Sequence, residues 1–217
     1  MFMSGPMGEG SWSRNRPAGE LQRDGHAVPE MSVNTLRRMI DVWALETASA
    51  QLDDKTEIED RFQRRYFRTH GASVLHAYAI MELRRQERVI AANDTWVALV
   101  PFWANSPFET MVLPRRRVSR LNGLTETERD GLVDLLIRLK MGYDTLFGGS
   151  LPYVFEWHGA PGRPARARHW QLHAHFHPPY LRPSSVRGQS SGFSKLEDAD
   201  RSLTPESAAA CLKEAVA

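Results

Sequence analysis

The chain has 217 residues, and its 28 Lys and Arg against 26 Asp and Glu leave a formal net charge of +2. This near balance argues against a nucleic-acid partner, while 41% hydrophobic and 25% charged residues are typical of a folded globular protein. No apolar run approaches the roughly 18 residues of a membrane span, and no secretory signal pattern stands out. We therefore expect a cytoplasmic protein with no nucleic-acid or membrane partner. The single cysteine, Cys211, excludes an internal disulfide and is predicted to be a buried, inert thiol.

The composition changes near residue 30. Residues 1–30 mix Gly, Ser, Pro and Arg without hydrophobic periodicity and are predicted to form a disordered tail. Residues 31–55 include apolar positions at helical spacing, which predicts a helix. The remainder, residues 56–217, is predicted to be one folded domain. The Ser- and Gly-rich residues 182–194 within it are predicted to be mobile.

Helices are expected over residues 51–66 and 73–88, and a long one begins at Thr125, where Glu128 completes a capping box. Gly148 and Gly149 end this helix, and a last short helix begins at residues 204–206. Strands are expected over 96–100, 109–113, 153–157 and 169–177. Strands joined by one long helix and short loops favour an α+β fold, with a mostly antiparallel sheet and helices on one face.

The strand predicted over residues 169–177 contains histidine at alternate positions. Side chains alternate between the faces of a strand, so one face is expected to present His169, Gln171, His173, His175 and His177. Same-face neighbours lie about 7 Å apart, so these imidazoles can converge on one metal ion or one phosphate. The spacing alone does not choose between a metal ligand and a phosphate-handling base.

A further histidine, His158, stands at the end of the preceding predicted strand, where functional side chains are often presented. A carboxylate would complete a set of three nitrogen ligands and one oxygen ligand. The residues themselves do not identify that carboxylate among the 26 acidic side chains.

Two stretches, Trp157 to Pro161 and His169 to Phe176, resemble the C-terminal half of the galactose-1-phosphate uridylyltransferase family, part of the histidine-triad superfamily. The resemblance extends over about residues 56–212. A shorter match at residues 31–44 is similar to a helix of the family's N-terminal half, so residues 31–55 are read as its remnant. The resemblance implies an α+β fold in which an antiparallel sheet forms a half-barrel with packed helices.

The family transfers a uridylyl group from UDP-glucose to galactose 1-phosphate through a covalent uridylyl-histidine. The resemblance implies a zinc or iron site whose ligands fall on Glu59, His158, His173 and His175, and a substrate loop that retains Gly192 and has Phe193 in place of Tyr. It also implies a homodimer, or a separate N-terminal half that complements this chain.

The printed sequence departs from the family in its nucleophile. The family's Ser-Asn-Pro-His-Pro-His-x-Gln segment does not occur in it. Without that histidine the chain is expected to be a truncated nucleotidyltransferase of galactose metabolism that is incomplete or inactive alone, with no catalytic residue of its own.

Two alternatives stay open. The spacing of His173, His175 and His177 also matches the histidine triad of free-standing nucleotide hydrolases and transferases, in which His175 would be the nucleophile. Alternatively, the chain is a non-catalytic remnant whose metal site is structural.

Overall fold

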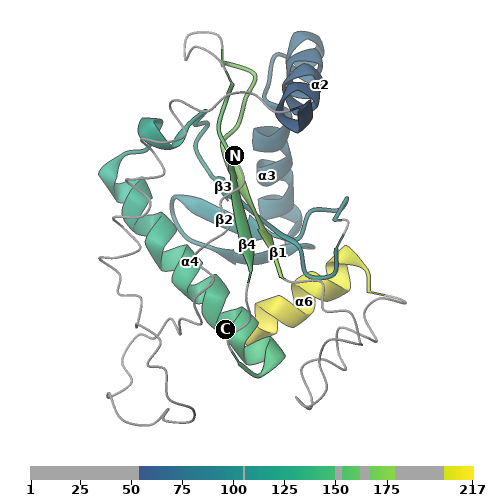
Figure 1. Cartoon of the computed structure of the whole chain (residues 1–217), viewed down its shortest axis with the longest axis vertical. Coiled ribbons are helices and arrows are strands. Elements are labelled where there is room, and N and C mark those ends of the chain that lie inside the picture. The colour runs from purple at the N-terminus through teal and green to yellow at the C-terminus, as the bar shows by residue number, and fades with distance from the viewer. Residues whose placement is uncertain (1–53, 105, 150–152, 162–166, 179–202) are drawn as a thin grey trace.

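A computed structural model describes residues 54–104, 106–149, 153–161, 167–178 and 203–217 (Figure 1). The predicted tail at 1–30, most of the predicted helix at 31–55 and the stretch 182–194 lie outside these ranges. The described helices are α2 (Asp54–His70), α3 (Val74–Arg85), the 3-10 helix η1 (Leu121–Gly123), α4 (Glu126–Phe147) and α6 (Pro205–Val216). The strands are β1 (Val89–Ala92), β2 (Trp96–Leu99), β3 (Thr110–Pro114), β4 (Val154–His158) and β5 (His173–His177).

The five strands form one open sheet in the order β1-β2-β3-β5-β4, in which every neighbouring pair is antiparallel. The predicted α+β class is therefore confirmed. The sequence analysis missed β1, whose four residues are too few for a hydrophobic period to stand out. The other strands were predicted close to their observed positions, with the exception of the start of β5.

Helices cover both faces of the sheet, so the expectation of helices on one face is wrong. On one face, Trp96 and Ala98 of β2 share a core cluster with residues of α4 and α6. On the other, Val97 and Leu99 share a second cluster with residues of α3. The physical reason is that β2 is apolar at every position, so each of its faces needs a helix to exclude water.

Strand β5 begins four residues later than expected, at His173. The preceding backbone groups have partners outside the ladder, since Trp170 N–H donates to the carbonyl of Ala167 at 3.2 Å and Leu172 N–H to that of Val118 at 2.6 Å. His169 and Gln171 are therefore in a turn and a connecting segment, and the shared strand face predicted for all five side chains is shortened to three.

The prediction for Cys211 is also wrong, because its thiol is exposed. Helix α6 begins where it was predicted, is capped by Thr204, and buries Ala208, Ala209 and Leu212. Cys211 lies outside that buried stripe. Among the described residues, no helix combines the length and the apolar character needed to cross a membrane.

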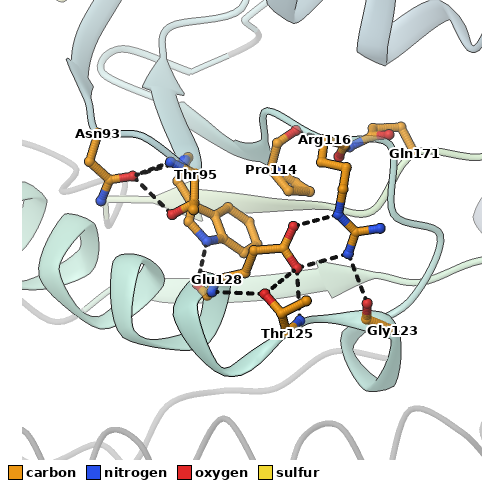
Figure 2. Close-up of polar contacts among 9 residues, drawn as sticks. Asn93, Thr95, Pro114, Arg116, Gly123, Thr125, Glu128 and Gln171 are labelled. Carbon is orange, nitrogen blue, oxygen red and sulfur yellow. Dashed lines mark hydrogen bonds and ion pairs between the residues drawn. The ribbon is translucent and has the colours of Figure 1, made fainter.

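The start of α4 is fastened to the sheet through Glu128, as Figure 2 shows. Thr125 Oγ1 accepts from Glu128 N–H at 3.2 Å, and the Glu128 carboxylate accepts from Thr125 N–H at 2.8 Å, which confirms the predicted capping box. The same carboxylate binds Arg116 at 2.7 and 2.8 Å, and the Glu128 carbonyl accepts from the Trp96 indole at 2.6 Å. One buried residue thus joins α4 to β2 and to the segment after β3.

We expect Glu128→Gln to lower the free energy of unfolding by about 1–2 kcal/mol near neutral pH. The ion pair with Arg116 holds the pKa of Glu128 below its ordinary value of 4.5. The stabilisation that Glu128 provides is complete above pH 4.5, the ordinary pKa of the unfolded chain. It disappears as the pH falls through the lower pKa of the folded state. Urea unfolding at several pH values should show the wild type and the variant converging below about pH 4.5. A stability difference that is constant down to pH 3 would contradict this assignment, and Glu126→Gln, an exposed position on the same turn, is the control.

Candidate metal centre

Strands β4 and β5 place three imidazoles on the sheet face that lies opposite α4. Phe155 and Trp157 of β4 point into the core beneath α4, so the alternate residue His158 points the other way. His158 is the register partner of His173, and Glu156 is the partner of His175. The ring nitrogens that His158, His173 and His175 can offer lie within 4.8 Å of one another.

Helix α2 supplies a carboxylate to this cluster. Glu59 Oε2 lies 3.1 Å from His158 Nδ1, and Glu59 Oε1 lies 3.1 Å from His173 Nε2. Of the apolar residues that predicted this helix, Ile58 and Phe62 are exposed, and Glu59 and the buried Gln63 face the sheet instead. The inward face of α2 is therefore polar, the reverse of the apolar inward stripe of a core-packing helix.

The other nitrogens of two imidazoles are held by acceptors. His173 Nδ1 donates to the carbonyl of Gln171 at 2.9 Å, and His175 Nδ1 donates to Glu109 Oε1 at 3.0 Å. Such bonds fix the tautomer of metal-binding histidines. The other ring nitrogen of His173, Nε2, faces Glu59 Oε1 at 3.1 Å. The pair offers one nitrogen and one oxygen atom of the kinds that bind transition metals.

Gln63 connects Glu59 to the segment that precedes β5. Its Nε2 donates to Glu59 Oε1 at 2.7 Å, and its Oε1 accepts from the backbone N–H of Gln171 at 3.3 Å. The carbonyl of Gln171 in turn orients His173, and its side chain donates to the carbonyls of Pro114 and Arg116 at 3.1 and 3.2 Å. The backbone of one residue therefore positions both a carboxylate and an imidazole of the cluster.

A second contact attaches α2 near the same place. His169 Nε2 donates to Asp60 Oδ1 at 2.6 Å, and Asp60 also accepts from Arg64 at 2.6 Å. His169 is buried against α2 and takes no part in the histidine cluster. Its role is to hold the helix that carries Glu59.

Burial and the charges within the cluster shift the pKa values of its members. Burial disfavours the charged form of His158, but its interactions with Glu156 and Glu59 outweigh burial and raise its pKa to about 9. Burial also opposes ionisation of Glu59, yet His173 and His158 hold the pKa of Glu59 well below its usual value. For His175 burial dominates, and its pKa is lowered. Without a metal ion, Glu59 is a carboxylate that forms an ion pair with His158.

The structure brings together Glu59, His158, His173 and His175, the four residues that the resemblance proposed as ligands. His169 lies outside the cluster in the structure. Glu109, which the sequence analysis did not single out, lies beside it. The sequence analysis placed Glu109 only at the start of a strand predicted over residues 109–113, which corresponds to β3. The substrate-loop candidates Gly192 and Phe193 lie outside the described residues.

Known proteins similar to this chain point to one family. Residues 59–217 match the family model described as galactose-1-phosphate uridyl transferase, C-terminal domain. A galactose-1-phosphate uridylyltransferase from Rattus norvegicus is 40% identical over 86% of this chain and 58% of its own length. One from Haemophilus influenzae is 42% identical over 76% and 48%. The solved structure of a uridylyltransferase mutant shares the fold, with a TM-score of 0.69 at 21% identity over 85% of this chain and 71% of that chain.

We expect Gln63→Leu to weaken metal binding by about ten- to a hundredfold, because Glu59 loses the donor that orients it. The measurement is competition with a chromogenic chelator on the full chain. Thermal unfolding of the metal-free protein checks that the variant folds. An affinity equal to that of the wild type would show that Gln63 does not position the ligand.

Proposed function

Because this chain belongs to the galactose-1-phosphate uridyl transferase family, through its C-terminal domain, we propose that it is the metal-binding part of a nucleotidyltransferase of galactose metabolism. The reaction moves a uridylyl group from UDP-glucose to galactose 1-phosphate. The observation that carries this proposal is the contact of the Glu59 carboxylate with His158 and His173, within a group of three imidazoles.

The four side chains suit a zinc or iron ion. Imidazole and carboxylate are ordinary ligands of both metals, and Gln171 and Glu109 already hold the outer nitrogens of His173 and His175. An ion held here would crosslink α2 to β4 and β5, elements that are far apart in the sequence. We assign it a structural role, which keeps the sheet face and α2 in one arrangement.

The chain spans about half the length of the curated relatives it matches. The printed sequence also has no Ser-Asn-Pro-His-Pro-His-x-Gln segment. The proposal therefore gives this chain the metal site and leaves the nucleophilic histidine to an N-terminal half. A homodimer, or a pair of complementary halves, would bring the two parts together.

The test is complementation. The purified chain is mixed with the N-terminal half of a relative, and UDP-galactose formation from UDP-glucose and galactose 1-phosphate is measured. We expect activity only in the mixture, because neither part alone holds both the nucleophile and the metal site. His173→Ala should reduce the activity of the mixture at least about tenfold.

His70→Ala is the control for this experiment, since it removes an exposed histidine at the end of α2. If two folded parts associate and still produce no UDP-galactose, the proposed function is wrong.

Metal removal gives a second prediction. If the ion crosslinks α2 to the sheet, a chelator should lower the thermal midpoint by about 5 °C or more, because binding to the native state alone stabilises it. Glu59→Gln should start lower and respond little to the chelator. An equal midpoint with and without metal would show that the ion contributes nothing to the fold.

In the alternative, a free-standing histidine-triad enzyme, His175 would be the nucleophile. The bond from its Nδ1 to Glu109 leaves Nε2 as the only lone pair, so it serves either as nucleophile or as metal ligand. Hydrolysis of a nucleoside phosphoramidate by the unmixed chain, abolished in His175→Ala, would favour the triad enzyme. Metal held firmly by His175 would exclude it.

A further inference from the structure

The outward face of α2 is apolar and basic, and no described residue covers it. Ile58 and Phe62 are one helical turn apart and remain 63% and 67% exposed. Arg61, Arg65 and Arg68 are exposed beside them. Successive residues of a helix are about 100° apart, so these five side chains share about a third of its circumference. Among the described residues, no carboxylate forms an ion pair with these three arginines.

This face is separate from the candidate metal centre. Glu59 and Gln63 lie on the inward side of α2, toward the sheet. In Figure 1, α2 lies at the edge of the described structure. Most of the stability of a helix in a protein comes from covering its apolar face. The outward face of α2 therefore has the character of a docking surface.

We propose that residues 41–53 of this chain dock on the outward face of α2. This stretch contains no Lys or Arg, and its acidic residues are Asp41, Glu46 and Asp53. Its larger apolar residues are Val42, Trp43, Leu45 and Leu52. The stretch therefore complements both the arginines and the two apolar side chains of the face.

The length of the connection allows this contact. Residue 53 directly precedes Asp54, the first residue described in α2. Fully extended, the chain from Trp43 to Asp54 reaches about 35 Å, whereas Phe62 lies about 12 Å along the helix from Asp54. A segment on so short a tether has an effective concentration of about millimolar order, which favours it over a second copy or a separate partner. In this arrangement the chain reverses direction before α2, so the helix predicted over residues 31–55 ends early.

The experiment is photocrosslinking on the full chain. The photoreactive amino acid p-benzoylphenylalanine replaces Phe62, one aromatic side chain for another, and crosslinked peptides are identified by mass spectrometry after irradiation. We expect crosslinks to residues 41–53 of the same chain. A mixture of isotope-labelled and unlabelled chains distinguishes these from crosslinks between copies. The control places the same amino acid at His70, which is exposed outside the outward face and should not crosslink to this stretch.

Charge reversal tests the electrostatic part of the contact. Arg61→Glu combined with Arg65→Glu should lower the crosslinking yield at least about fivefold, because like charges then face each other. Adding Asp41→Lys and Glu46→Lys to that variant should restore the yield. Arg84→Glu combined with Arg85→Glu reverses two exposed charges at the end of α3 and is the matched control.

The outcomes decide the proposal once thermal unfolding shows that each variant is folded. Crosslinks between copies, crosslinks only to other parts of the same chain, or no crosslinks at all would each overturn the docking of residues 41–53. A yield that charge reversal leaves unchanged would overturn the pairing of the arginines with the acidic residues. The ligands of the proposed metal centre are intact in every variant, so none of these results bears on the proposed function.

Discussion

The contact on which the site depends is that of one carboxylate with two imidazoles from neighbouring strands. Glu59 lies 3.1 Å from His158 and from His173, although 99 residues separate it from His158. Both charged groups are costly to place there unless they are paired, because a half-buried carboxylate and a half-buried imidazolium each lose part of their hydration. The attraction between them, or an ion shared by them, compensates for this loss and holds α2 against the sheet.

The rest of the local structure serves that contact. Gln63 and Asp60 attach the inward face of α2 to Gln171 and His169, so the helix is held by hydrogen bonds where a core helix would use apolar packing. The capped start of α4 and its ion pair with Arg116 fix the opposite layer (Figures 1 and 2). The sheet between these layers pairs β4 with β5 residue by residue, and this pairing keeps the imidazoles at a spacing that one ion can bridge.

Several features follow from local sequence, and the sequence analysis predicted them. The capping box of Thr125 and Glu128, the glycine end of α4 and the alternation along β5 involve residues within a few positions of one another. Features that depend on remote partners were missed or wrong. His169 was predicted to lie on the strand because it continues the alternation of His173, His175 and His177. Only the tertiary structure shows that His169 instead contacts Asp60 on α2.

The sequence by itself determined the α+β class, the family and the histidine face of β5, because each depends on residue types that recur at short, regular spacing. Tertiary structure decided which carboxylate meets those imidazoles, that helices cover both faces of the sheet, and that Cys211 is exposed. Local patterns carry no distance information across a hundred residues. Glu59 could be selected from the sequence only through resemblance, and Glu109 acquired significance only when β3 was paired beside β5.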